Sequence, residues 1–180
     1  MSTYPLTPTS YLVLGCLASA GPSTPYELKQ AVASSVGYFW SFPHSQLYSE
    51  PARMAAAGLV QEQREESGRR RRVFSITDAG RTELDDWLAR PTAGLPDIRD
   101  VGLLKLFFSD LTGADQIRTL ANSQREAHEE RLTFYQGLTS GPPQSAAEAT
   151  IGLGIAWERA AAAFWASIVD NPPGSEDHIR

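Results

Sequence analysis

The stretch that most restricts the fold of this chain is GRRRRVFSITDAG at Gly68–Gly80, taken together with Gly58-Leu59-Val60 shortly before it. A glycine turn precedes four arginines and a strand-like run, and TDAG then has the pattern of a helix start. The residues in between leave room for two strands, over 59–65 and 70–77, joined at Ser67-Gly68. The sequence therefore predicts a β-hairpin that stands between two helices and carries arginines at and beyond its tip.

The arginines at Arg69–Arg72 give this hairpin a cationic end. Duplex DNA carries a dense line of phosphate charge that arginine neutralises, so the hairpin suits contact with a DNA backbone. Only alternate residues of a strand point the same way, so we expect about two of the four arginines to face DNA. Glu62, Glu65 and Glu66 on the first strand are expected to pair with some of the others.

Three helices are predicted ahead of the hairpin. The first begins at Pro8 with Thr7 as its N-cap, a residue pair that commonly starts a helix. The second begins after Ser23 or Thr24, since Thr24 and Glu27 have the spacing of a capping box. The third runs over 44–57 and stops at Gly58, because glycine favours the end of a helix.

Pro51 lies inside the third predicted helix, where it lacks a backbone donor and pushes against the Leu47 carbonyl. We therefore expect a bend there, or a helix that becomes regular only after Ser49. A fourth helix, over 78–90, follows the hairpin and is predicted to bury three apolar residues on one face. These residues are Leu84, Trp87 and Leu88.

The order helix, helix, helix, hairpin, helix is that of a winged helix-turn-helix. In that fold the third helix enters the major groove, and the hairpin, called the wing, touches phosphates or the minor groove. Polar side chains on the third helix can bond base edges or phosphate oxygens. The predicted DNA-binding residues are Tyr26, Lys29, His44, Ser45, Gln46, Tyr48, Ser49, Arg53, Arg69, Arg70, Arg71 and Arg72.

The net charge of −5 argues against a nucleic-acid partner until its distribution is considered. Residues 1–90 hold nine Lys or Arg and nine Asp or Glu, whereas residues 91–180 hold seven and twelve. The basic charge of the first half is concentrated in the wing arginines. A neutral first half with one basic tip favours binding as two copies, and an acidic second half suits a partner or sensor module.

Pro91 and residues 92–96 interrupt the helical pattern, so we place a domain boundary there. The DNA-binding domain is predicted over 1–92 and a helical domain over 93–180. Helices over 97–110, 112–138 and 146–169 would bury their apolar faces poorly alone, which favours a homodimer interface. The aromatic residues expected at that interface, or around a ligand cavity, are Phe107, Phe108, Phe134, Tyr135, Trp157, Phe164 and Trp165.

The sequence contains no nucleophile motif, phosphate-binding loop or nucleotide fingerprint, so we expect neither an enzyme nor a cofactor. The three histidines lie far apart, and we expect no metal site. Cys16 is the single cysteine, so an internal disulfide is excluded. No run reaches the ~20 apolar residues of a membrane span, and no basic segment opens a secretory signal, so we expect a cytoplasmic protein.

The chain resembles the PadR family of bacterial transcriptional regulators. LTPTSYLVLGCLASAGPSTPYELKQAV at 6–32 is similar to its first two helices, and HSQLYSEPARMAAAGLV at 44–60 to its recognition helix. GRRRRVFSITDAGRTELDDWL at 68–88 is similar to its wing and fourth helix. DVGLLKLFF at 100–108 and the long helix after it resemble the larger carboxyl-terminal dimerisation domain of one branch. The sequence departs from the family at Ser49, where proline is common, and at Pro25, where glycine is common.

The resemblance implies a homodimeric repressor on an inverted repeat, released from DNA in some members by small aromatic molecules. The predicted fold is mainly α with a small β-hairpin: an N-terminal winged helix-turn-helix plus a C-terminal helical dimerisation domain. Two alternatives to a simple repressor remain open. One is a regulator whose aromatic dimer cavity binds a ligand that controls DNA affinity. The other is a winged helix used only for protein–protein contact.

Overall fold

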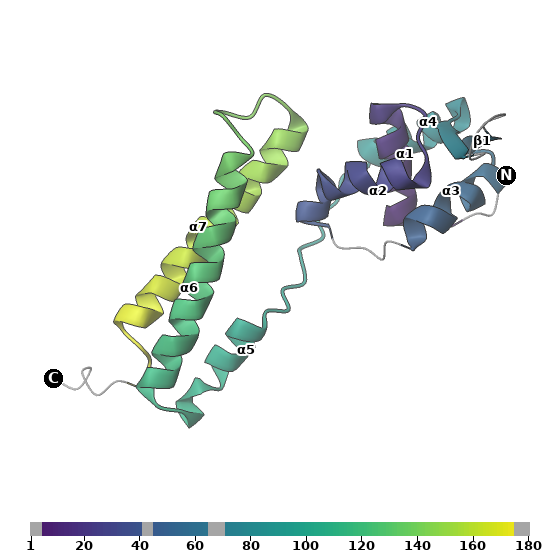
Figure 1. Cartoon of the computed structure of the whole chain (residues 1–180). Coiled ribbons are helices and arrows are strands. Elements are labelled where there is room, and N and C mark those ends of the chain that lie inside the picture. The colour runs from purple at the N-terminus through teal and green to yellow at the C-terminus, as the bar shows by residue number, and fades with distance from the viewer. Residues whose placement is uncertain (1–4, 41–44, 65–70, 175–180) are drawn as a thin grey trace. The chain divides into compact units, whose positions relative to one another are not determined.

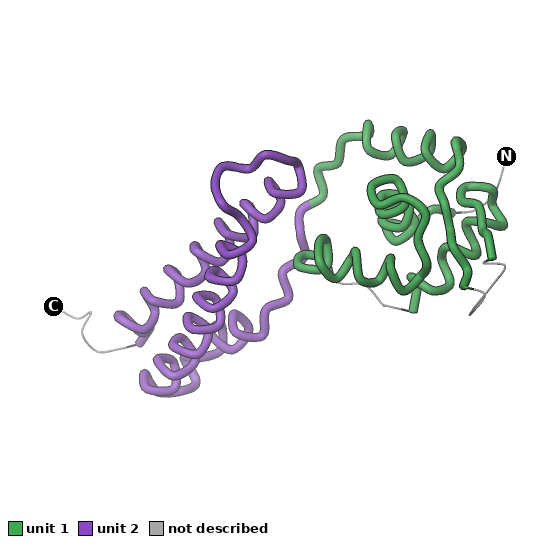
Figure 2. Tube along the Cα trace, turned by 45° about the horizontal axis from the view of Figure 1, so that its top comes forward, with its two compact units in different colours: residues 1–94 green, residues 95–180 purple. Residues whose placement is uncertain are grey.

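The computed structural model of the protein describes residues 5–40, 45–64 and 71–174. The chain divides into two compact units, Met1–Gly94 (unit 1) and Leu95–Arg180 (unit 2), coloured separately in Figure 2. Unit 1 contains α1 (Pro8–Ala20), α2 (Pro25–Ala33), η1 (Val36–Tyr38), α3 (Gln46–Ala56), β1 (Val60–Arg64), β2 (Arg72–Ile76) and α4 (Asp78–Ala89). Unit 2 contains α5 (Val101–Phe107), η2 (Ser109–Leu111), α6 (Ala114–Gly137) and α7 (Ala146–Asp170), as Figure 1 shows. The predicted fold class, mainly helical with one hairpin, is confirmed.

Side-chain caps start the first two helices as predicted. The Ser10 N–H donates to Thr7 Oγ1, and the Thr7 N–H donates back to Ser10 Oγ at 2.9 Å, directly before Pro8. At α2 the Thr24 N–H donates to Glu27 Oε2 at 2.8 Å, and the Glu27 N–H donates to Thr24 Oγ1. Hydrogen bonds from the Thr24 backbone and hydroxyl lower the pKa of Glu27 below its ordinary value.

The core of unit 1 lies where the helices meet the hairpin. β1 and β2 are antiparallel, with Val60 opposite Ile76 and Glu62 opposite Phe74. Phe74 is fully buried, and its backbone also pairs on the other side with Ser23, just before α2. The wing is thereby fixed to the start of α2. The core residues are Val13, Leu14, Leu17, Leu28, Val32, Leu47, Met54, Val60, Phe74 and Leu84.

Two glycines permit the backbone arrangement on either side of the hairpin, one at the end of α3 and one at the start of α4. Gly58 has φ of 78°, a left-handed conformation that ends α3 at low cost, as the sequence predicted. Gly80, in the first turn of α4, lies against the chain that enters β1. A Cβ atom there would be 2.0 Å from the Leu59 carbonyl oxygen. The glycine in TDAG is therefore required by the close approach of α4 to this strand.

Pro51 does not delay the regular part of α3. The helix is continuous from Gln46 through Pro51, whose ring is buried, so the expectation of a helix regular only after Ser49 is wrong. The N–H that Pro51 lacks would have bonded the Leu47 carbonyl, so a single intrahelical hydrogen bond is lost and the helix continues.

The prediction that α4 buries Trp87 and Leu88 is also wrong. Leu84 joins the core, but Trp87 is 41% exposed and Leu88 is 65% exposed. Trp87 stacks on Tyr11 of α1 with ring centroids 4.5 Å apart and planes 9° apart, so one ring face is covered. The last turn of α4 extends beyond the core that covers its first two turns.

In unit 2, α6 and α7 lie side by side along much of their length (Figure 1). Gly154 of α7 allows the Tyr135 ring of α6 to approach, since a Cβ there would be 3.3 Å from that ring. The helix predicted over 97–110 begins later, at Val101, because the Asp100 carboxylate accepts the Gly102 N–H at 2.6 Å and so caps the helix there. It ends at Phe107 and is followed by the short η2 helix.

Candidate nucleic-acid interface

The α3 helix has one face in the core of unit 1 and one face exposed. Leu47, Glu50, Pro51 and Met54 are buried. Spacings of three and four residues place them on the same side of the helix. The exposed side carries the predicted DNA-binding residues that the structure describes in this region: Ser45, Gln46, Tyr48, Ser49 and Arg53. His44 lies outside the described residues.

Two polar contacts hold the start of α3 against the start of α1. The Thr9 hydroxyl donates to Gln46 Oε1 at 2.8 Å, and the Ser10 hydroxyl donates to Glu50 Oε1 at 2.5 Å. Glu50 is only 4% exposed, and its other oxygen lies 3.3 Å from Arg53 Nη1. Sequence reasoning missed Glu50, although an acidic residue at helical spacing between Leu47 and Met54 is a signal of a buried, partnered carboxylate.

The wing places Arg72 in an ion pair within the hairpin. Arg72 Nε and Nη2 each donate to one oxygen of Glu62 at 2.7 Å, and its guanidinium lies 5.2 Å from the centre of the Phe74 ring. This hydrogen bonding lowers the pKa of Glu62 and raises that of Arg72. The predicted pairing of Glu62 with a wing arginine is confirmed. The positive charge of Arg72 is therefore already paired with a carboxylate of the protein.

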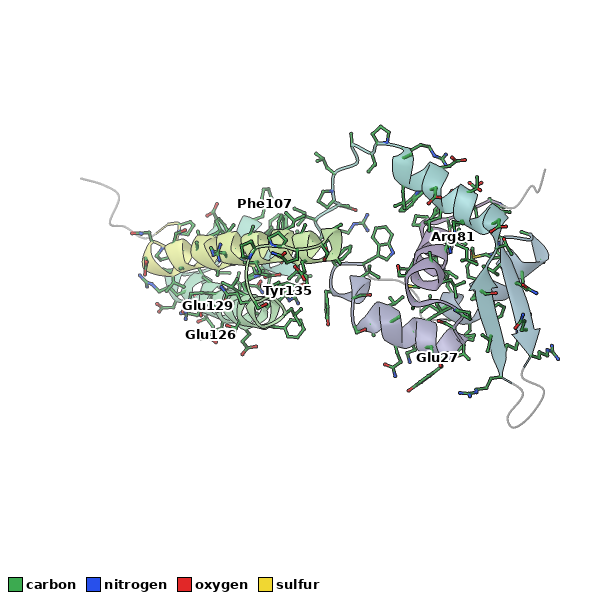
Figure 3. All side chains as sticks on the ribbon, turned by 90° about the horizontal axis from the view of Figure 1, so that it is seen from above. Glu27, Arg81, Phe107, Glu126, Glu129 and Tyr135 are labelled. Atoms are coloured by element: carbon green, nitrogen blue, oxygen red, sulfur yellow. The ribbon has the colours of Figure 1, made fainter. Side chains whose placement is uncertain are left out.

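Arg71 is exposed and comes directly before β2. Its charge contributes, as the smallest of four causes, to the lowered pKa of Glu27 on α2. In Figure 3, Glu27 lies at the end of α2 that is next to the hairpin. Arg71 therefore lies within electrostatic range of Glu27, in the first turn of α2. Arg69, Arg70, Glu65 and Glu66 lie outside the described residues.

Tyr26 and Lys29 are on the outer side of α2. Tyr26 is exposed, and its hydroxyl accepts a hydrogen bond from Gln30 Nε2 at 2.8 Å, while Lys29 is half-buried. Lys29 carries a positive charge and the Tyr26 hydroxyl is a hydrogen-bond donor, and phosphate oxygens accept from both kinds of group. Together with Arg71 these groups make a surface that suits a phosphate backbone.

The predicted aromatic residues of unit 2 fall into two groups. Trp165 is 1% exposed and Tyr135 is buried, and packing within unit 2 accounts for both. Phe107, Phe108, Phe134, Trp157 and Phe164 are exposed, and Phe107, labelled in Figure 3, is the most exposed at 77%. An open groove of about 690 Å³ between α5, η2 and α6 is lined by the apolar residues Leu104, Phe108, Leu111, Ile117 and Leu120 and by the polar residues Lys105, Ser109, Thr112, Gln116, Thr119 and Ser123.

Residues 5–40, 45–64 and 71–174 contain no group of three or more His, Cys, Asp or Glu arranged to hold a metal ion. Within the same ranges, every helix is too short or too polar to cross a bilayer.

Two family models match successive parts of the chain. Residues 13–86 match the transcriptional regulator PadR-like family, and residues 98–168 match the model described as virulence activator alpha C-term. Among curated proteins, the negative transcriptional regulator PadR of Bacillus subtilis is 27% identical over 129 residues, which are 71% of this chain and 70% of the relative.

Solved structures share the fold over nearly the whole length. Bacillus subtilis PadR in complex with operator DNA matches with a TM-score of 0.80 and 23% identity over 93% of this chain and 99% of that one. The same protein in complex with p-coumaric acid matches with a TM-score of 0.74 and 23% identity over 92% and 97%. The PadR-like family model therefore covers the winged unit, the second model covers the helical unit, and the chain as a whole shares its fold with PadR.

Proposed function

We propose that the protein is a homodimeric repressor that binds an inverted-repeat DNA operator, with one α3 helix in the major groove of each half-site. The observation that carries this proposal is the polar outer face of α3, which lies beside a wing and an α2 surface suited to phosphates. The proposal also has the support of a relative that is a negative regulator and of its structure on operator DNA.

Base contacts are assigned to the exposed side of α3. Gln46 and Arg53 have N–H donors that fit base edges, and Ser45, Tyr48 and Ser49 have hydroxyls that bond bases or phosphates. Phosphate contacts are assigned to Tyr26, Lys29 and Arg71. His44, Arg69 and Arg70 stay predicted contacts from the sequence. Arg72 is assigned mainly to holding the two strands together through Glu62.

The dimer contact is assigned to unit 2. α5 exposes Val101, Leu104, Phe107 and Phe108 to solvent, and the apolar groove beside it is open. Exposed apolar surface of this kind on a regulator marks an interaction site, and a second copy would cover it. A two-fold dimer places its two recognition helices on half-sites about one helical turn apart.

Binding to the DNA upstream of the protein's own gene tests the proposal. Affinity measured at increasing salt should fall steeply for the wild type, since each phosphate contact contributes about 0.9 to the slope of log K against log salt. Arg71→Ala should weaken binding and flatten that slope by about one contact. Arg118→Ala, which removes an exposed arginine from α6, is the charge-matched control and should leave both unchanged.

A different result separates this function from its alternative. If the full-length protein binds no duplex at low salt, with its helical content intact, the chain is a winged-helix module for protein partners. If Arg71→Ala and Arg118→Ala have the same effect, the wing does not contact DNA.

A second candidate function is release from DNA by a small planar aromatic ligand. Half-exposed Trp157 and Phe164 on α7 and the structure of a relative with p-coumaric acid support it. A hydroxycinnamic acid should quench tryptophan fluorescence and lower DNA affinity over the same concentration range. Trp157→Phe should remove the quenching if this residue lies at the site. Quenching without any change in DNA affinity would contradict effector control.

A further inference from the structure

Gln46, the first residue of the recognition helix, has its side-chain oxygen engaged inside the protein. The Thr9 hydroxyl of α1 donates to Gln46 Oε1 at 2.8 Å. Thr9 is buried, while Gln46 is exposed on the polar face of α3. The glutamine is thus held at one end by the fold and presents its other polar atom, Nε2, to whatever faces α3.

A neighbouring contact keeps this arrangement in place. One helical turn after Gln46, the buried Glu50 accepts the Ser10 hydroxyl at 2.5 Å. Thr9 and Ser10 are adjacent on α1, so two hydrogen bonds join the first turn of α1 to the first two turns of α3. These bonds fix the rotation of α3 about its axis and hold the Gln46 amide toward Thr9.

The engaged oxygen changes what a glutamine can recognise. A free glutamine pairs with adenine by accepting from N6 with its oxygen and donating to N7 with its nitrogen, and both atoms must lie along the base edge. When the oxygen accepts from Thr9, one of its two lone pairs is used and it is held toward α1, so the two N–H donors of Nε2 are the main groups that the amide offers to a base. Guanine offers two acceptors in the major groove, N7 and O6, and thymine offers O4, whereas adenine sets its N6 donor beside its N7 acceptor, so a group of donors favours guanine or thymine.

We propose that Gln46 is a specificity-determining residue that donates to guanine or thymine, and that Thr9 is the positioning residue that disfavours the two-bond pairing with adenine. This proposal rests on the proposed function, since it concerns which base α3 selects. Thr9, a buried residue of α1, would then influence which DNA sequence the protein selects without lying on the DNA-facing surface itself.

Selection of binding sites from a pool of random DNA duplexes tests the proposal with the full-length protein. The wild type should enrich guanine or thymine at one position of each half-site. Gln46→Ala should lose selectivity at that position and keep it elsewhere. Thr9→Ser keeps the hydroxyl and should retain the wild-type base, whereas Thr9→Val removes it and should raise the share of adenine there by roughly tenfold.

A second variant does not depend on the buried site. Gln46→Glu changes an exposed side chain from a donor to an acceptor, so it should reject the wild-type base and favour cytosine, which offers N4 as a donor. An unchanged share of adenine with Thr9→Val, or retention of the wild-type base by Gln46→Glu, would overturn the proposal. Selection of adenine by the wild type at the position that depends on Gln46 would overturn it as well. Enrichment of no sequence at all by the wild type would instead contradict the proposed DNA-binding function.

Discussion

At the scale of single residues, Glu62 determines how much of the wing's positive charge is available to DNA. It holds Arg72 in a two-bond ion pair on the surface of the hairpin. Glu62→Gln should release this arginine, so DNA affinity should rise and the salt slope should steepen by up to about one contact. Because the pair is partly exposed, its loss should cost only about 0–1 kcal/mol of stability. Fluorescence anisotropy with labelled operator DNA measures affinity and slope together.

The control for this substitution is Glu130→Gln, which removes the same charge from an exposed position on α6. It should leave affinity and slope close to those of the wild type. An equal gain from both variants would show that net charge is responsible, rather than the release of Arg72.

The same ion pair makes the hairpin sensitive to acid. Arg72 lowers the pKa of Glu62 in the folded protein, so the pair stabilises the fold above the unfolded-state pKa of about 4.3. That stability is lost as the pH falls through the lower, folded value. The melting temperature should therefore fall less between about pH 6 and about pH 3 in Glu62→Gln than in the wild type. Melting curves followed by circular dichroism measure this, and parallel curves for the two proteins would contradict it.

At the scale of helices and strands, the contact between α1 and α3 depends on a buried carboxylate. Ser10→Ala removes the hydroxyl that donates to Glu50 and that also accepts the Thr7 N–H in the cap of α1, which together should cost about 1–3 kcal/mol of unfolding free energy. Ser19→Ala is the matched control on the same helix, because its exposed hydroxyl bonds only the Gly15 carbonyl. That control should change stability by less than about 0.5 kcal/mol. Urea denaturation compares the two, and equal losses would show that Glu50 has other sufficient donors.

Alanine substitutions at two glycines test how closely α4 packs on the chain that enters the wing. Gly80→Ala places a Cβ 2.0 Å from the Leu59 carbonyl oxygen, so backbone must move and we expect a loss of about 1–3 kcal/mol. Gly15, inside α1, has nothing within 4 Å of such an atom. Gly15→Ala should therefore stabilise the protein by about 0.5–1 kcal/mol. Thermal unfolding of the two variants should move in opposite directions, and a neutral Gly80→Ala would refute the close approach.

Local signals made the elements of unit 1 predictable. Each of these signals depends on residues close in sequence. They are the capping box at Thr24 and Glu27, the helix-ending Gly58, and the alternation of side chains between the two faces of the strand around Phe74. The contact between Ser10 and Glu50 joins residues 40 positions apart, so no local pattern indicates it. The exposure of Trp87 and Leu88 was missed for a similar reason, since helical spacing shows which residues share a face but not how far the core extends.

At the scale of the whole molecule, the exposed apolar surface of α5 should control assembly. Phe107→Asp places a charge where we propose the partner subunit packs, so the protein should remain folded, sediment as a monomer and lose affinity for a two-half-site operator. Tyr26→Ser removes an exposed ring from unit 1 and should weaken DNA binding while the protein stays dimeric. Analytical ultracentrifugation separates the two effects. A dimeric Phe107→Asp would show that α5 lies outside the interface.

The pairing of Ser23 with Phe74 has a consequence for how copies of this protein associate. At Phe74, β2 has a hydrogen-bonded neighbour on both sides, while β1 is only five residues long and carries the polar run Gln61–Arg64 along its length. Long, flat, apolar strand edges recruit other strands and cause aggregation, whereas short and charged edges resist it. Self-association is thus assigned to the helices of unit 2, because the short, polar edge of β1 disfavours pairing with a strand of another copy.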